Sequence, residues 1–502
     1  MPLRSLGLLL ALAACTTATN VSSPARGPAT STEPAAEVRG LQNVQRTLRL
    51  LDESQAGTLT GPVRILFYGQ SITQSAWSRK VEQTLRLRYP RANLWVENRA
   101  LGAFHAELLA STAESDLYPA YPDLVIFHVY GDHHRYEDIV RRLRERTTAE
   151  LLLQTDHVTK PEELDEPTDP RLLAAKGEQW SAFMNGAFLP GLVARYGVAL
   201  CDQRSAWKEV LQREQLAPSA LLLDGLHVNS RGDALMASLV ASCLRRDAAL
   251  DPAPADAWVR TLQVGRDVSW SESRELELVF EGNRIDAVVA GGGSALTVSI
   301  DGDKPSHNPA LYTFARAHAR EGGKWPPIHD LSTQLALGAL RHVETFTLEV
   351  HQESAAALAG GHEQSAPRYV FSARGDLTGA DGEGRSDVRF VSPSGRLVID
   401  PEDWNVAYTF ALAGRDPPPA AFTVDLRVEP HFTDSVASLP GGARDLRVIT
   451  LAEGLPNTQH TLLLTRAEHP LDGLASSATK ESPDSSATLV ALRVYRPPLD
   501  RH

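Results

Sequence analysis

The sequence predicts an α/β domain with a parallel, doubly wound α/β/α sheet over residues 40–250, followed by an all-β sandwich domain over residues 251–502. In the first region, short apolar runs alternate with amphipathic helical segments, which is typical of a parallel sheet covered by helices on both faces. After residue 250 the helical periodicity largely stops. Short strand-like runs separated by turn residues follow, and this pattern favours a sandwich or jelly roll.

The length and composition limit the class of protein. A chain of 502 residues exceeds the usual size of one domain, so at least two hydrophobic cores are expected. The 50 Lys and Arg residues against 62 Asp and Glu residues give a formal net charge of −12. A surface of that sign repels phosphate backbones, which argues against nucleic-acid binding. Three cysteines are too few for a disulfide scaffold.

Five short apolar runs in the first region are predicted as strands. They cover residues 64–68, 93–97, 123–129, 151–155 and 198–202. Helices are predicted between and after them, at residues 75–88, 136–146, 171–196 and 229–247. Because parallel strands end at the same edge of a sheet, the reactive groups of such a domain are expected in the loops beyond the carboxyl ends of the strands.

The N-terminus is predicted as an export signal over residues 1–15. One cation, Arg4, precedes an apolar run over residues 6–14 that is too short to span a bilayer. Residues 12–15 resemble a bacterial lipobox, which implies that Cys15 carries the lipid. The alternative is a plain secretory signal that happens to contain Cys.

The segment over residues 16–39 is rich in Thr, Ser, Pro and Ala, and it is predicted as a flexible tether. We therefore expect an exported protein held to the cell envelope by acyl chains. Thr16 follows the cysteine, where inner-membrane lipoproteins carry Asp, and this favours the outer membrane.

Ser71 is the candidate nucleophile. It follows the first predicted strand by two residues, after Gly69, and stands near the start of the next helix. Backbone N–H groups at such a position can stabilise a developing oxyanion. The segment is not the Gly-x-Ser-x-Gly elbow of α/β-hydrolases, because Thr73 occupies the last position. The alternative is that Ser71 only caps the helix.

Asp224 and His227 are the candidate partners of this serine. They lie three residues apart, just before the last predicted helix of the domain. Serine needs an adjacent base, His is the usual one, and a carboxylate that accepts the second ring N–H orients it. The alternative is a capping Asp beside a surface His. Because both segments occur in one α/β domain, we predict a serine hydrolase.

These segments resemble the SGNH (GDSL-type) esterase family over about 210 residues, from Arg64 to the end of the last helix. The resemblance implies a flavodoxin-like α/β/α domain, and it assigns the nucleophile, acid and base to Ser71, Asp224 and His227. It matches the glycine of the family's second block to Gly102. The family's oxyanion hole would then include the backbone N–H groups of Ser71 and Gly102.

The family's third block departs from its usual pattern in this sequence. The family carries an Asn there as a third oxyanion donor, whereas residues 130–134 of this chain contain no Asn. Anchoring on Gly131 puts His133 at that position, and counting from Asp123 puts Asp132 there. An ionised carboxylate cannot donate a hydrogen bond, so we favour His133.

No cofactor or metal is expected. Five histidines fall between residues 105 and 157, but their spacing matches no familiar ligand pattern. We expect His128 in the core, and His133 and His157 facing the substrate at strand ends. Cys201 and Cys243 can form a disulfide in an exported protein, or they can remain two buried thiols.

The second region is predicted as an accessory β domain. Its strand-like runs are residues 276–280, 284–289, 296–300, 346–350, 369–371, 422–426, 446–451 and 461–464, and the long stretch in the middle leaves room for an insertion or a second sandwich. Four tryptophans offer either faces for sugar rings or core packing. They are Trp258, Trp270, Trp325 and Trp404.

Together these observations predict an exported, membrane-anchored esterase that removes acetyl groups from a polysaccharide. The choice of substrate follows from the family resemblance and the β domain. Two alternatives remain open at this point. One is a lipase or thioesterase of the same family, and the other is a non-catalytic polysaccharide-binding lipoprotein with a decayed hydrolase site.

Overall fold

The computed structural model describes the chain in eight segments. These are residues 35–165, 180–250, 257–291, 295–331, 342–353, 367–437, 445–466 and 489–500. The predicted export signal with Cys15 lies outside the described residues, as do most of the predicted tether and residues 171–179 of the helix predicted over 171–196.

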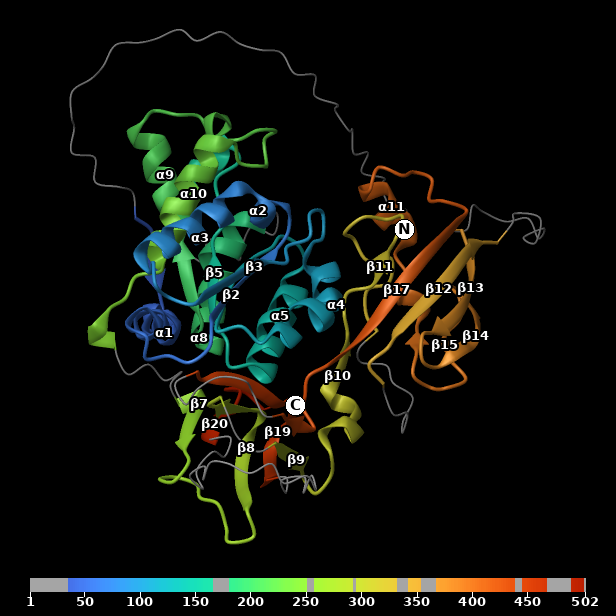
Figure 1. Cartoon of the computed structure of the whole chain (residues 1–502). Helices are drawn as coiled ribbons and strands as arrows, with labels where there is room; N and C mark the ends of the chain where they lie inside the picture. Colours follow the sequence, from blue (N-terminus) through green and yellow to red (C-terminus); the bar gives the residue numbers. More distant parts are fainter. Residues whose placement is uncertain are drawn as a thin grey trace. The chain divides into compact units, whose positions relative to one another are not determined.

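A six-stranded sheet lies at the centre of the first region (Figure 1). Its strands are β1 (Glu37–Arg39), β2 (Val63–Gly69), β3 (Leu94–Asn98), β4 (Leu124–His128), β5 (Glu150–Gln154) and β6 (Ala199–Asp202). The spatial order is β1-β6-β5-β4-β2-β3. All neighbours are parallel except β1, which runs antiparallel to β6. The winding reverses at β2, which lies between β3 and β4, and ligand sites of open α/β sheets form at such a point.

Helices cover both faces of this sheet, because successive residues of a strand point to opposite sides. Ile65 and Phe67 of β2 belong to a buried cluster with α1, α3, α9 and α10, whereas Leu66 and Tyr68 belong to a second cluster with α4, α5 and α8. The α-helices of this region are α1 (Gln45–Ala56), α2 (Ser71–Gln74), α3 (Ala76–Arg88), α4 (Ala106–Asp116), α5 (His133–Arg146), α7 (Trp180–Phe183), α8 (Leu189–Tyr196), α9 (Gln203–Arg213) and α10 (Ser230–Cys243).

The structure adds elements that the sequence patterns did not predict. Strand β1 lies inside the segment predicted as tether, so the sheet begins at Glu37 rather than at residue 40. Helices α1, α4 and α9 are also new. Over the described part of residues 171–196 the single predicted helix is interrupted by a π-helical turn, Met184–Phe188, between α7 and α8.

The second region forms two antiparallel six-stranded sheets, with a small β-hairpin beside them. What we call the terminal sheet has the order β18-β9-β19-β8-β20-β7, and the inserted sheet has the order β10-β17-β12-β13-β14, with β11 also paired to β17. The elements are β7 (Val259–Gln263), β8 (Glu275–Val289), β9 (Leu296–Ile300), β10 (Tyr312–Phe314), β11 (His318–Ala319), β12 (Thr345–Gln352), β13 (Tyr369–Gly375), β14 (Gly379–Arg385), the hairpin β15 (Phe390–Val391) and β16 (Val398–Ile399), α11 (Val406–Leu412), β17 (Ala421–Pro430), β18 (Ser435–Val436), β19 (Arg447–Arg466) and β20 (Leu489–Tyr495).

The two sheets have separate hydrophobic cores. Buried residues of β8, β9, β19 and β20 form one cluster, and buried residues of β12, β13 and β17 form another with Phe410 of α11. Along the chain, the inserted sheet lies between β9 and β18 of the terminal sheet. The expected β region is therefore present as two sheets with their own cores, and the inserted sheet lies in the long middle stretch where the sequence left room for an insertion. In the described segments, no helix is both long and apolar enough to cross a membrane.

Cys201 and Cys243 form a disulfide. It links the third residue of β6 to the last residue of α10, and the two Cα atoms are 5.8 Å apart. Both residues are fully buried in the cluster on one face of the parallel sheet. Of the two alternatives left by the sequence, the structure has the bonded one.

Candidate active site

The structure brings Ser71, His227 and Asp224 together, although Ser71 is 156 residues from His227 along the chain. The Nε2 atom of His227 lies 2.9 Å from Ser71 Oγ, and its Nδ1 atom lies 2.8 Å from Asp224 Oδ2. Because a carboxylate only accepts hydrogen bonds, Nδ1 carries the ring proton, and Nε2 is left to accept the hydroxyl proton of Ser71. This is the arrangement that a serine nucleophile and its base require.

The end of β2 fixes the position of Ser71. Gly69 lies so close to β4 that a Cβ atom added to it would be 2.1 Å from the carbonyl oxygen of His128. Only glycine fits there without a backbone shift. Ile72 is buried, and the Thr73 hydroxyl donates to the same His128 carbonyl at 3.4 Å. Ser71 therefore begins α2 at the point where the winding of the sheet reverses.

A short loop between two buried anchors carries the acid and the base. Leu222 and Val228 form an antiparallel bridge across it, and the N–H of Leu223 donates to the carbonyl of His227 at 2.7 Å. Asn229 then caps α10 by accepting from two backbone N–H groups, while its own amide donates to the carbonyls of residues 220 and 222. These bonds fix the loop at both ends, although Asp224 itself is exposed.

Asp224 is held in its charged form. Partial burial acts to raise the pKa of its carboxyl group, but hydrogen bonds outweigh that effect, and the pKa lies below the ordinary value of 3.8. The donors are the backbone N–H of His227, its ring, and the backbone N–H of Leu226. A carboxylate that stays ionised at neutral pH can stabilise an imidazolium at His227.

Gly102 lies against the nucleophile. A Cβ atom added to it would be 3.7 Å from the Cβ of Ser71 and 2.7 Å from the Oε1 atom of Gln74. The Gln74 amide in turn donates to the carbonyl of Ala100 at 2.6 Å. The segment that we call the Gly102 loop (residues 101–104) is therefore in contact with α2, which is where the second backbone donor of an oxyanion hole would stand.

Asn98 connects the Gly102 loop to the serine turn. Its amide donates to the carbonyl of Thr73 at 2.8 Å and to the Ser78 hydroxyl at 3.0 Å, and its Oδ1 atom accepts from the N–H of Ala100. One side chain thus bonds to the segment that carries the nucleophile and to the segment that leads into Gly102.

Two side chains from the inserted region, by which we mean residues 301–434 between β9 and β18, also bond to the Gly102 loop. The indole N–H of Trp325 donates to the carbonyl of Gly102 at 2.8 Å, and the hydroxyl of Tyr408 donates to the carbonyl of Ala103 at 2.7 Å. The ring of Phe104, which is fully buried, packs against Tyr408 and the edge of His329. Trp325 is thus an N–H donor beside the site, a role that neither sequence alternative for this residue included.

The two candidates for the third oxyanion donor have other surroundings. Asp132 caps α5, where its carboxylate accepts from the N–H of Arg135 at 2.9 Å. His133 begins α5, and its ring packs among Trp180, Phe183 and Phe188. Desolvation lowers the pKa of His133, so the ring is neutral at pH 7. Its Nε2 atom is buried and has no hydrogen-bond partner in the described part of the chain.

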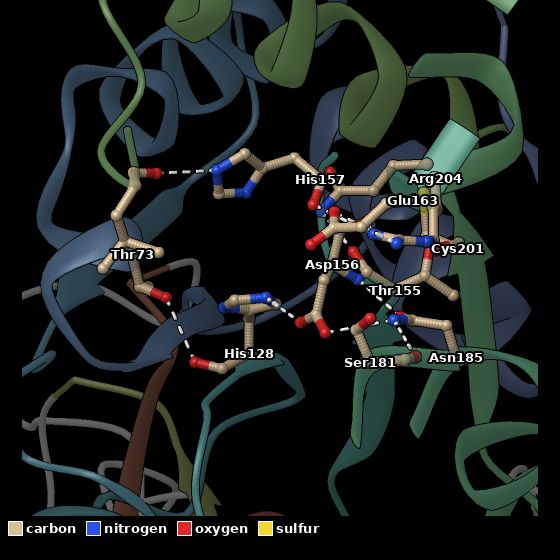
Figure 2. Close-up of polar contacts among 12 residues, drawn as sticks. Thr73, His128, Thr155, Asp156, His157, Glu163, Ser181, Asn185, Cys201 and Arg204 are labelled. Atoms are coloured by element: carbon tan, nitrogen blue, oxygen red, sulfur yellow. Dashed lines mark hydrogen bonds and ion pairs between the residues drawn. The ribbon is translucent and has the colours of Figure 1, made fainter. Parts of the chain in front are cut away.

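A buried polar network contacts the loop that carries Asp224 and His227, which we call the catalytic loop (residues 223–227) (Figure 2). His128 Nε2 pairs with Asp156 Oδ1 at 2.9 Å, and the other oxygen of Asp156 accepts from Asn185. His157 Nε2 donates to the carbonyl of Leu226 at 2.8 Å, and Arg204 donates to the carbonyl of His157. The network therefore reaches the backbone of the loop that carries Asp224 and His227.

His157 is not at the surface. It is 1% exposed, and this burial lowers the pKa of its ring to about 4. The sequence-based expectation that His157 faces the substrate is therefore wrong, whereas His128 is in the core as expected, at 2% exposed. Within the described segments no group of three His, Cys, Asp or Glu side chains is arranged to hold a metal ion.

Comparisons with known proteins find similarity at low sequence identity. No family model and no curated protein matches the sequence. Among solved structures, a two-domain esterase active on acetylated mannans is 14% identical with a TM-score of 0.33, over 92% of this chain and 99% of that one. An acetylxylan esterase from Geobacillus stearothermophilus is 20% identical with a TM-score of 0.31, over 37% of this chain and 94% of that one. These similar structures are carbohydrate acetylesterases.

Sequence patterns missed the residues that support the site. Asn98, Gln74 and Tyr408 carry no motif signal, because each acts through a hydrogen bond to a backbone carbonyl or amide. Every residue has a backbone carbonyl and almost every residue a backbone N–H, so a side chain that bonds to the backbone requires no particular residue type at the partner position. Ser71, Asp224 and His227 were accessible from sequence because the serine and the aspartate both bond to the histidine side chain.

Proposed function

We propose that this chain is a serine esterase of the SGNH type that removes acetyl groups from a polysaccharide. The observation that carries the proposal is the series of two hydrogen bonds from Asp224 through His227 to Ser71. The sheet lends further support. If its five parallel strands are numbered along the chain, their spatial order in the sheet is 2-1-3-4-5. This is the flavodoxin-like order that the family resemblance implies.

The proposed reaction proceeds through an acyl-enzyme. His227 Nε2 takes the hydroxyl proton as Ser71 Oγ attacks the ester carbonyl, and Asp224 stabilises the imidazolium that forms. The tetrahedral intermediate collapses, and the proton passes from His227 to the leaving sugar oxygen. Water then attacks the acetyl-serine with the same base, which releases acetate and restores Ser71.

The backbone N–H groups of Ser71 and Gly102 are proposed to hold the oxyanion. The contact between Gly102 and the Ser71 side chain supports this pair. His133 stays a proposal for the third donor. Its neutral ring has one N–H to give, whereas Asp132 already caps α5 with its carboxylate.

The openness of the site favours a large hydrophilic substrate. The side chains of His227 and Asp224 are 34% and 52% exposed. Leu223, which precedes Asp224, and Leu226, which precedes His227, are 76% and 40% exposed, so they offer an apolar surface beside the base. A polymer can reach such a rim, whereas a long acyl chain is usually bound in an enclosed apolar pocket.

Export and lipid anchoring at Cys15 belong to the same proposal. The disulfide between Cys201 and Cys243 supports an oxidising compartment, since disulfides are rare in cytosolic proteins. The motif over residues 12–15 supports the anchor, with the outer membrane as its proposed location.

A chromogenic acetyl ester assay of the wild type and Ser71→Ala tests the proposed function. We expect turnover by the wild type and loss of at least about 10³-fold in the variant. Acetate release from acetylated mannan and xylan then tests the polymer. Equal inactivity of both proteins on a broad acyl panel, with retained glycan binding, would support a binding protein instead. Strong preference for long acyl chains would support a lipase.

A further inference from the structure

We propose that Trp325 and Tyr408 are positioning residues that hold the oxyanion-binding conformation of the Gly102 loop from the inserted region of the chain. The proposal rests on the proposed function, because it concerns how the backbone donor at Gly102 is kept in place. Its basis is the pair of hydrogen bonds to consecutive carbonyls, from Trp325 Nε1 to Gly102 at 2.8 Å and from the Tyr408 hydroxyl to Ala103 at 2.7 Å.

The loop has a conformation that its own sequence disfavours. Ala103 has a φ of +66°, in the left-handed region where a side chain with a Cβ atom is strained. An alanine in that region is retained only where surrounding contacts hold it. The bonds to the carbonyls on both sides of the Ala103 Cα atom supply such contacts.

Hydrogen bonds to three consecutive carbonyls limit which groups the loop turns toward the nucleophile. The Gly102 N–H shares its peptide with the Leu101 carbonyl, and Trp325 and Tyr408 bond to the carbonyls of the two peptides that follow. The carbonyls of Leu101, Gly102 and Ala103 accept hydrogen bonds from Phe104 N–H, Trp325 and Tyr408 respectively. If a peptide plane of this loop rotated by half a turn, its C=O would point where its N–H had pointed. A carbonyl oxygen beside Ser71 would then repel the oxyanion that an N–H stabilises. With all three carbonyls bonded, such a rotation breaks a hydrogen bond each time.

The two donors belong to one connected unit. The Thr409 hydroxyl of α11 donates to the carbonyl of Pro326, and the N–H of Asn405 donates to the carbonyl of Pro327. These bonds connect the helix that carries Tyr408 to the segment that carries Trp325. Arg316 forms a bidentate ion pair with the buried Asp116 at the end of α4. The hydrogen bonds of Trp325 and Tyr408 to the Gly102 loop are therefore part of a larger set of contacts between the inserted region and the first region.

Two variants that each remove one of the donors test the proposal in the full chain. Tyr408→Phe removes one hydroxyl and keeps the ring against Phe104, and Trp325→Phe removes the indole N–H. Each is expected to lower kcat on a chromogenic acetyl ester about fivefold to tenfold, and the double variant more, with KM within about twofold of wild type. The matched control is Tyr312→Phe, which removes a hydroxyl bonded to the Ser306 carbonyl in the same region.

A boronic acid supplies a second readout, because it forms a tetrahedral anionic adduct on an active serine and imitates the oxyanion. We expect its inhibition constant to rise in parallel with the fall in kcat in both variants, and to stay at the wild-type value in Tyr312→Phe. Melting temperatures of the variants and the control should agree within about 3 °C. A change in KM alone, or an equal loss of kcat in the control, would overturn the proposal.

The design separates this proposal from the proposed function. If Ser71→Ala is inactive while the double variant keeps wild-type kcat and boronate affinity, the positioning role is wrong and the esterase stands. If Ser71→Ala keeps full activity, the proposed function itself fails, and the positioning role fails with it.

Discussion

His227 bonds to a charged group on one side and to a reactive one on the other. Hydrogen bonds hold Asp224 ionised, and the proton on Nδ1 of His227 follows from that charge. The free lone pair on Nε2 then points at Ser71. The tautomer of the ring therefore depends on a carboxylate that is half exposed, which makes Asp224 the residue whose replacement is most informative.

Asp224→Asn is expected to lower kcat by about three orders of magnitude, because the amide can donate to Nδ1 and so favours the wrong tautomer of His227. The assay is steady-state hydrolysis of an acetyl ester between pH 6 and pH 9. Asp224→Glu, which keeps the charge, serves as the comparison and should retain more activity. Equal kcat in the wild type and the amide variant would contradict the role given to Asp224.

His157 is expected to make the protein less stable in acid. Its pKa is about 4 when folded, because burial disfavours the charged ring, and about 6.5 when unfolded. Between these values the unfolded chain binds more protons than the folded one. The His157 ring therefore leaves the free energy of unfolding unchanged above about pH 6.5 and lowers it progressively as the pH falls toward 4. By pH 4.5 this single group should lower the free energy of unfolding by about 2–3 kcal/mol.

His157→Gln isolates that contribution, because glutamine keeps an N–H donor for the carbonyl of Leu226 but does not titrate. Denaturant unfolding at pH 7 and pH 4.5 measures it. The variant should lose less stability than the wild type between the two pH values. An equal loss in both proteins would show that the His157 ring does not stay neutral in the fold.

At the scale of elements, Asn229 connects a helix to the catalytic loop. Asn229→Ala removes the cap of α10 and leaves the carbonyls of Ala220 and Leu222 without their donor. We expect a loss of about 2–3 kcal/mol in the free energy of unfolding, together with lower kcat as the loop loosens. Asn229→Asp keeps the accepting oxygens and should lose about half as much. Thermal and denaturant melts compare the three proteins.

The strands that the sequence predicted are those with strong local signals. Runs such as residues 65–68 and 124–127 are buried on both faces and continuously apolar, and the structure has β2 and β4 there. Strand β1 has three residues and an exposed, mixed pattern, and it is stabilised by pairing with β6 rather than by its own sequence. Such an element depends on a partner that is distant in sequence.

In the candidate site, too, some residues could be predicted from the sequence and others could not. Ser71, Asp224 and His227 were accessible because their side chains need one another, and chemistry limits the residue types that fit. His157 was assigned wrongly because it follows a strand end, where an exposed histidine and a buried one have the same local sequence. Only the packing around it distinguishes the two, and that packing comes from residues such as Trp207 and Arg204.

At the scale of the whole molecule, the ion pair between Arg316 and Asp116 connects the inserted region to α4. Burial raises the pKa of Asp116 despite its bonds to Arg316, so the carboxyl depends on that partner. Arg316→Ala is expected to lower the free energy of unfolding by about 3 kcal/mol, since it leaves a buried carboxylate unpaired. Adding Asp116→Asn should recover part of that loss. A strictly additive double-variant cycle would contradict the coupling.

The proposed lipid anchor makes a prediction for intact cells. The wild-type chain should partition with membranes and take up labelled fatty acid, and Cys15→Ser should abolish the labelling. Fractionation of the envelope then locates the protein. Uptake of label by Cys15→Ser, or an unprocessed N-terminus in the wild type, would contradict the anchor without bearing on the catalytic proposal.

Covalent labelling shows whether the Ser71 hydroxyl is activated. A fluorophosphonate reacts only with a serine whose hydroxyl is activated by a neighbouring base. Peptide mapping by mass spectrometry should find one adduct, on Ser71, in the wild-type chain, and slow or absent labelling in His227→Gln. Labelling of another serine, or wild-type reactivity in Ser71→Ala, would show that Ser71 is not the nucleophile.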